Sequence, residues 1–299
     1  MDVFLRSCEC NPDLTWLIFS DIEKPEYRPE NIQFIELRKS DLSKLIYEKT
    51  GISHALENPH KLCDFKPMYG HIFEEYLEGY DFWGHCDMDV IWGDLSAFLK
   101  SISYQIFDII STRPNTISGH FTLYRNIDRL NLFYQEVPNY RRAFEKSYYQ
   151  GFDEGFFSYH IFNEISTGKL DVKPYWEKRN CIDNAELMRM PNGWYWKNGK
   201  IKNYLGKEGN YLHMIKWKKI LNEVIVSDPT KVTYFNITQF GIWEGKIPSK
   251  YLKKMIEENG FIYAYRYWRK KIKNAFQDKV KKSQLQNRAN VPKGYEVLE

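Results

Sequence analysis

The stretch Tyr80-Asp-Phe-Trp-Gly-His-Cys-Asp-Met-Asp-Val-Ile-Trp-Gly-Asp-Leu95 places two carboxylates inside an apolar run. Phe82–Cys86 before them and Val90–Trp92 after them both have the composition of buried strand. Asp87 and Asp89 are costly in such a setting unless their charge is compensated. Residues two apart in a strand point to the same side, so we expect the carboxylates to converge. Their oxygen ligands suit Mg²⁺ or Mn²⁺, whereas the alternative is a solvent-facing loop with ordinary carboxylates.

The segments around this stretch alternate between strand and helix patterns. We expect strands over 15–20 and 32–37, a helix over 42–49 that ends at Gly51, a long helix over 61–77, a short helix over 95–102, strands over 106–111 and 121–124, helix within 131–148 and over 153–162, and a hairpin over 194–201 that turns at Asn198-Gly199. The order predicts an α/β protein with a mostly parallel sheet flanked by helices. Ligands bind such sheets beyond the carboxyl ends of the strands, where we expect the aspartate pair.

Charge is unevenly distributed along the 299 residues. Residues 250–282 hold eleven Lys/Arg and three Asp/Glu, a net +8, while the whole chain carries +4, so the remainder carries about −4. We therefore predict a main domain over 1–245 and a basic helical extension over 246–299. The basic, aromatic extension suits an anionic membrane surface, although a plain solvated helix is an alternative. We expect no nucleic-acid partner, because the body is mildly acidic and carries no nucleic-acid motif.

The remaining composition indicates a cytoplasmic protein. No stretch of 18 apolar residues and no signal peptide is present, so we expect no membrane span. The five cysteines are odd in number and form no CxxC pair, so we expect them to be reduced. Aromatic residues make up 17% of the chain, which suits stacking on sugar rings or bases and equally an aromatic-rich core.

Several segments together carry a family resemblance. They are Phe4–Cys8 with Asn11-Pro12, Trp16–Asp21, Lys61–Pro67, Tyr80–Leu95, Gly119–Asn126, Asp153-Glu154 and His213–Lys218. Over residues 3 to 220 the chain resembles GT-A glycosyltransferases, whose DxD motif holds a divalent metal on the diphosphate of a nucleotide-sugar. It is most similar to bacterial glycosyltransferases of capsular and other surface-polysaccharide biosynthesis. The joint pattern is fairly specific, whereas a DxD alone is not.

The resemblance implies a metal site and contacts to the donor. Asp87 and Asp89 would bind Mn²⁺ or Mg²⁺, with His213 as third ligand in the manner of glycogenin-like enzymes. The donor-binding residues implied by the resemblance are Asp64, Lys66, Gly119, His120, Lys216 and Lys218. A packed core histidine is the alternative for His213, and a helix-start carboxylate beside a surface lysine is the alternative for Asp64 and Lys66.

The resemblance also implies catalytic residues. Asp153 and Glu154 would face the acceptor and the anomeric carbon, as a general base or as a stabiliser of oxocarbenium charge. The alternative is a helix N-cap followed by a first-turn glutamate.

The implied function is a metal-dependent hexosyltransferase. It would transfer a hexose from a UDP-sugar to a lipid-linked or oligosaccharide acceptor, in the cytoplasm or peripherally on the inner face of the cell membrane. Similar proteins have a strand of the type I-x-F-I-I-x-Y-F-G ahead of the first helix, which supports the nucleobase pocket, and the printed sequence starts after it. We therefore keep a second hypothesis, a non-catalytic nucleotide- or glycan-binding protein of the same fold. A metal-dependent phosphodiesterase would need more His and Asp ligands than the chain offers.

Overall fold

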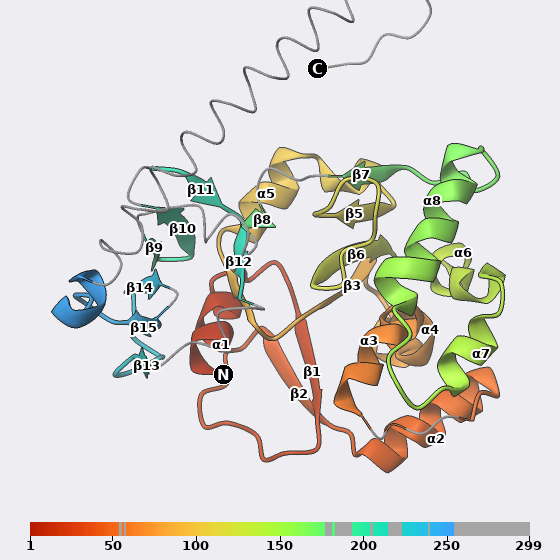
Figure 1. Cartoon of the computed structure of the whole chain (residues 1–299), viewed down its shortest axis with the longest axis horizontal. Coiled ribbons are helices and arrows are strands. Elements are labelled where there is room, and N and C mark those ends of the chain that lie inside the picture. The colour runs from red at the N-terminus through yellow and green to blue at the C-terminus, as the bar shows by residue number, and fades with distance from the viewer. Residues whose placement is uncertain are drawn as a thin grey trace, which may run out of the picture. The chain divides into compact units, whose positions relative to one another are not determined.

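The structure is a computed structural model (Figure 1). It describes residues 1–53, 56, 58–176, 181–182, 193–203, 206–214, 223–238 and 240–253. The chain divides into two compact units, one of residues 1–187 with 192–246 and one of residues 188–191 with 247–299. In the second unit only residues 247–253 are described, so most of the predicted basic extension lies outside the described residues.

The first elements of the chain follow the sequence pattern. Helix α1 (Asp2–Glu9) precedes strands β1 (Trp16–Ser20) and β2 (Ile32–Glu36), which form a parallel pair. Helix α2 (Lys39–Thr50) ends where Gly51 adopts a φ of +64°, a left-handed conformation that glycine enters at little cost. The predicted strands and the stop at Gly51 are therefore confirmed.

The strand that precedes the aspartate pair lies at the edge of a four-stranded sheet. The sheet has the order β3-β6-β5-β7, formed by β3 (Phe82–Cys86), β6 (Phe121–Arg125), β5 (Ile109–Ser111) and β7 (Pro174–Trp176). The β3–β6 and β5–β6 pairs are antiparallel and only β5–β7 is parallel. The α/β composition is confirmed, but the described sheets are mixed rather than mostly parallel. The connection from β5 to β6, residues 112–120, is too short for the crossover that parallel neighbours need.

A second sheet joins the aspartate pair to a distant part of the chain. Strand β4 (Val90–Trp92) pairs antiparallel with β12 (Tyr211–His213), and β12 pairs parallel with β8 (Cys181–Ile182). In this register His213 stands opposite Val90, the residue that follows Asp89. The pairing therefore delivers His213 to the aspartate pair across more than a hundred residues of sequence.

A third sheet contains the predicted hairpin. Its six strands, in the order β11-β10-β9-β14-β15-β13, are β11 (Glu208–Gly209), β10 (Lys200–Asn203), β9 (Trp194–Lys197), β14 (Tyr234–Thr238), β15 (Gly241–Trp243) and β13 (Glu223–Ile225). Asn198 and Gly199 both have positive φ between β9 and β10, as a tight hairpin turn requires. The hairpin is confirmed.

The predicted long helix over 61–77 is wrong. The segment consists of short pieces, η1 (Pro59–Lys61), α3 (Leu62–Phe65), η2 (Lys66–Met68), α4 (Tyr69–Ile72) and η3 (Glu74–Tyr76). Pro67 lies inside this segment, where its ring removes one backbone donor and crowds the preceding turn. The interruption matters for the site, because it places Asp64 and Lys66 in separate elements with different surroundings.

The remaining helices are also short. They are α5 (Leu95–Ser101), η4 (Tyr104–Ile106), α6 (Asp128–Asn131), η5 (Phe133–Glu136), α7 (Tyr140–Glu145), the π-helix η6 (Phe152–Phe157) and α8 (Ser158–Ser166). The helix predicted over 153–162 is thus a π-helical turn followed by an α-helix. Figure 1 shows α3, α4, α7 and α8 on one side, next to β3 and β6.

Two apolar clusters hold these elements together. One packs Phe65, Trp83, Tyr124 and Phe157 between the short helices and the four-stranded sheet. The other packs residues of α1, β4 and α5, with Trp92 fully buried. Among the described residues, no helix is long and apolar enough to cross a membrane.

Candidate metal centre and neighbouring carboxylates

Asp87 and Asp89 lie in the turn that joins β3 to β4, not within a strand as the sequence suggested. The Asp87 N–H donates to the carbonyl of His120 at 3.1 Å, and the Asp89 carbonyl accepts from the N–H of Met214 at 2.8 Å. These bonds fix the turn to the strands beside it. Met88 points outward and is 49% exposed. The two carboxylates converge because of the turn rather than because of strand alternation.

His213 completes a cluster with the two aspartates. One ligand atom from each residue lies within 4.8 Å of the other two. His213 Nε2 is 3.7 Å from Asp87 Oδ2 and 3.6 Å from Asp89 Oδ1. Its side chain is only 4% exposed, and Nε2 has no hydrogen-bond partner among the described residues. A buried imidazole nitrogen that faces two carboxylates fits a divalent cation with mixed oxygen and nitrogen ligands, such as Mn²⁺.

His120 lies next to His213, one of the three residues of the cluster. Its ring stacks on that of His213, with centroids 4.1 Å apart and 19° between the planes. Burial, with further contributions from His213, Arg113 and Lys66, lowers the pKa of His120 to about 2, so the ring is neutral at physiological pH. The sequence assigned His120 to the donor, and the structure places it where it fixes the ring plane of His213.

Lys66 contacts Asp87 at the carboxylate oxygen that does not face His213. Its ammonium group contacts Asp87 Oδ1 and donates to the carbonyl of Gly119 at 2.7 Å. Burial alone would lower the pKa of Lys66, but the Asp87 carboxylate outweighs it and the pKa is raised above the ordinary value. Lys66 therefore stays charged, and Asp87 has a cation on one oxygen and the His213 nitrogen opposite the other.

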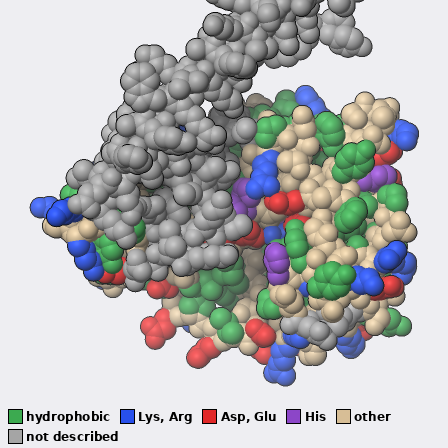
Figure 2. Space-filling view, viewed as in Figure 1, with side chains coloured by type: hydrophobic (Ala, Val, Ile, Leu, Met, Phe, Trp, Pro, Cys, Tyr) green, Lys and Arg blue, Asp and Glu red, His purple; other side chains and the backbone are tan. Residues whose placement is uncertain are grey.

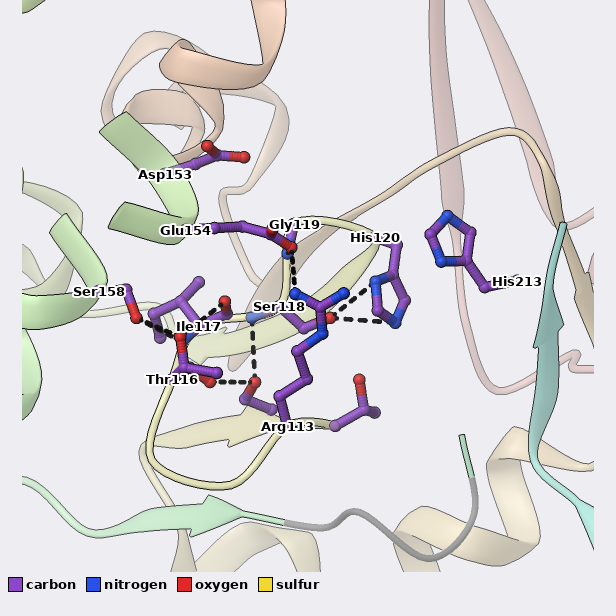
Figure 3. A network of polar contacts seen from close by, with 12 residues as sticks. Arg113, Thr116, Ile117, Ser118, Gly119, His120, Asp153, Glu154, Ser158 and His213 are labelled. Carbon is purple, nitrogen blue, oxygen red and sulfur yellow. Dashed lines mark hydrogen bonds and ion pairs between the residues drawn. The ribbon is translucent and has the colours of Figure 1, made fainter. Parts of the chain in front are cut away.

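Gly119 connects this cluster to the predicted catalytic carboxylates (Figure 3). Its N–H donates to Glu154 Oε1 at 2.8 Å, and the same oxygen accepts from Arg113 Nη1 at 2.9 Å. A Cβ on Gly119 would lie 3.0 Å from both Asp153 Oδ2 and Glu154 Oε1, so a larger residue here would require the two carboxylates to move by a few tenths of an ångström. The structure therefore brings together Lys66, Gly119, Asp153 and Glu154 as the sequence proposed.

Asp153 is the more deeply buried of the two carboxylates. It accepts a hydrogen bond from the Tyr149 hydroxyl at 3.0 Å. Burial raises the pKa of Asp153 above its ordinary value, and the repulsion from Glu154 acts in the same direction. The backbone hydrogen bond from Glu154 opposes the increase, as do Lys66 and the hydrogen bond from Tyr149. The pair thus consists of one buried carboxyl and one half-exposed carboxylate that Arg113 neutralises.

Asp64 is not one of the residues of the metal cluster. It is fully buried and accepts three hydrogen bonds, from Lys61 Nζ at 2.9 Å and from the backbone N–H groups of Gln150 at 2.8 Å and Phe152 at 2.7 Å. These bonds hold the start of the π-helix that carries Asp153 and Glu154. In this structure Asp64 supports that helix, and the predicted contact of Asp64 with the nucleotide-sugar stays a prediction.

Other parts of the prediction lie elsewhere. Lys216 and Lys218 are outside the described residues. Sequence reasoning missed Arg113 and Tyr149, because Ser111-Thr-Arg-Pro114 looks like an ordinary turn and Tyr149 is one of 22 tyrosines.

A cavity of about 240 Å³ lies beside β1 and β2, and none of the predicted site residues lines it. Figure 2 shows charged and histidine side chains together near the middle of the visible face.

Comparison with known proteins gives a family but no activity. Residues 1–246 match the family described as "Family of unknown function (DUF6625)", and because the match covers most of the chain, the protein belongs to that family. No curated protein matches the chain significantly.

Proposed function

We propose that the protein is a metal-dependent glycosyltransferase that moves a hexose from a UDP-sugar to a surface-polysaccharide acceptor. The observation that carries the proposal is the cluster of Asp87, Asp89 and His213, with its buried imidazole nitrogen directed at two carboxylates. Such a ligand set leaves coordination positions open for the oxygens of a diphosphate. The GT-A fold is part of this proposal, because a mixed α/β architecture alone does not define it.

Each group around the cluster has a role in the proposed reaction. Asp87, Asp89 and His213 would hold Mn²⁺ or Mg²⁺, which supplies Lewis-acid neutralisation of the leaving diphosphate. Lys66 supplies a point charge to the phosphates. Asp153 and Glu154 are consecutive residues of the π-helix. They lie across Gly119 from Lys66 and would face the sugar and the acceptor.

The test is a donor screen with Mn²⁺ on the wild-type protein and on Asp89→Ala. We expect Asp89→Ala to lower the transfer rate by at least about 100-fold and to abolish Mn²⁺ binding in calorimetry, because a ligand and half of the attracting charge are lost. The melting temperature should change little, since the Asp89 side chain, although only 13% exposed, lies beside a second carboxylate that repels it. Asp171→Ala, which removes an exposed carboxylate, is the matched control. A transfer rate that survives Asp89→Ala or EDTA rules out the metal role.

One observation favours the non-catalytic alternative. Glu154 is engaged by Arg113 and by Gly119, and Asp153 is engaged by Tyr149, so both candidate carboxylates have internal partners. A protein that only binds a nucleotide or glycan would show this arrangement without needing a base. UDP binding in calorimetry, together with no transfer or donor hydrolysis for any sugar in the screen, would favour this function.

The place of action is also a proposal. We propose that the protein works in the cytoplasm and contacts the anionic inner face of the membrane through residues 250–282, where a lipid-linked acceptor would be located. The support is the net charge of +8 on that segment. Binding to anionic vesicles that is lost when residues 250–299 are deleted would test it.

A further inference from the structure

Lys66 occupies an unusual position for a residue beside a metal site. Its ammonium group already pairs with Oδ1 of Asp87, a carboxylate whose charge a cation at this site would need. The lysine side chain is 7% exposed and Asp87 is 30% exposed, so the pair is shielded but can be reached from solvent on the aspartate side. A built-in cation therefore competes for a carboxylate of the candidate metal centre.

We propose that Lys66 couples the metal to an anionic ligand, so that the site binds a divalent cation weakly alone and tightly together with the phosphates of a nucleoside diphosphate. The inference deepens the proposed function and rests on its metal site. In the absence of the anion, Lys66 repels the incoming cation and holds Asp87. When the anion arrives, its oxygens draw the ammonium group away and release the full charge of the carboxylate to the metal.

The local charges support this coupling. Asp87, Asp89 and Lys66 sum to a net charge of −1, which is a weak attraction for a divalent cation compared with two unopposed carboxylates. Addition of the cation makes the same group +1, which favours an anion. Because linkage is reciprocal, the factor by which the anion strengthens metal binding equals the factor by which the metal strengthens anion binding.

A second contact extends the coupling toward Glu154. Lys66 Nζ donates to the carbonyl of Gly119, and the N–H of Gly119 donates to Glu154 Oε1. Lys66, which would interact with both the metal and the anion, therefore also holds the Gly119 peptide unit, and that unit positions the candidate catalytic carboxylate of Glu154. An anion that draws the Lys66 ammonium group away from the Gly119 carbonyl would loosen the Gly119 peptide unit. The loosening would therefore follow binding of the anion.

The experiment measures Mn²⁺ affinity by electron paramagnetic resonance, without and with UDP and corrected for the Mn²⁺–UDP complex in solution. The variants are Lys66→Gln, whose amide can still donate to Gly119, and Lys66→Arg, which keeps the charge. Lys100→Met, which removes a lysine from the exposed pair with Asp13, is the remote control. Thermal unfolding of each variant establishes that it is folded, and Lys66→Met serves as a second uncharged variant.

We expect both uncharged variants to bind Mn²⁺ alone about tenfold more tightly than wild type and to lose most of the further gain caused by UDP. Lys66→Arg and Lys100→Met should behave like wild type. If wild type binds Mn²⁺ but the uncharged variants bind it equally or more weakly, the coupling is overturned while the metal site stands. If no form binds Mn²⁺ with or without UDP, the metal site fails and the coupling with it.

Discussion

Two lysine–aspartate pairs that begin five residues apart in the sequence have opposite surroundings. Lys61 and Asp64 are both 0% exposed, and every polar contact they make is internal. Lys66 pairs with Asp87, whose second oxygen faces His213 and whose side chain is 30% exposed. The same residue types therefore form a closed structural pair in one place and an open pair in the other, and the difference lies in whether a carboxylate oxygen remains directed at a ligand position.

The closed pair is the place to expect the largest loss of stability. Asp64→Ala would leave the Lys61 ammonium group buried with only the Ala143 carbonyl, and would leave the N–H groups of Gln150 and Phe152 without their acceptor. Breaking one partner of a buried pair costs about 3–5 kcal/mol. We expect the free energy of unfolding in urea to fall by that amount.

The control for this variant is Asp13→Ala, which breaks the exposed pair with Lys100 and should change stability by less than about 1 kcal/mol. Mn²⁺ affinity of the folded fraction should be unchanged in Asp64→Ala. A stable Asp64→Ala protein with weakened UDP binding would contradict the division into a closed and an open pair, and would return Asp64 to the donor site.

Gly119 is the point at which the open pair meets Asp153 and Glu154, the proposed catalytic carboxylates, and its substitution gives the next effect in size. Gly119→Ala places a methyl group 3.0 Å from Asp153 Oδ2 and Glu154 Oε1, which is tighter than ordinary contact. We expect transfer activity to fall about tenfold and stability to fall by about 1–2 kcal/mol, because the two carboxylates must move away from the added methyl group. Gly155→Ala, on the same π-helix with open space around it, is the matched control. Equal activities of the two alanine variants would show that the approach of Gly119 to the carboxylates has no functional value.

How much of this site could be predicted from the sequence depended on the range of the interactions. Asp87 and Asp89 were recognisable because two charges in an apolar run are costly wherever the chain places them. Their convergence was predicted, but for the wrong reason. The two aspartates lie in a turn and not in a strand, and backbone hydrogen bonds to His120 and Met214 hold that turn in place. The stop at Gly51 and the hairpin at Asn198-Gly199 were predictable because positive φ is a local property.

The errors come from non-local or competing effects. The apolar spacing over 61–77 fits a helix, but Pro67 breaks it, and the break sends Asp64 and Lys66 to different partners. The role of Arg113 has no sequence signal, because its partner Glu154 lies 41 residues away. Sheet direction could not be read from strand and helix alternation alone, since it depended on the short connection between β5 and β6.

Asp153 gives the smallest predicted effect and the finest distinction between structural and functional carboxylates. Its pKa is raised in the folded protein, mainly by burial, so the folded state binds this proton more readily than the unfolded state does. The charged form is therefore unfavourable above the raised pKa, and the free energy of unfolding falls as the pH rises from the ordinary Asp value of 3.8 through the raised one. Above the raised pKa that penalty is fully present.

Asp153→Asn removes the charge and keeps an oxygen that can accept from Tyr149. We expect the variant to be more stable than wild type by about 1 kcal/mol at pH 7, with a difference that shrinks as the pH falls toward 4, and to be less active. Urea unfolding at several pH values measures this, with Asp171→Asn as the exposed control. A loss of stability at pH 7 would mean that Lys66 and Tyr149 compensate the Asp153 charge fully. Asp153 would then belong with the closed pair, as a carboxylate kept for structure, rather than with the open one.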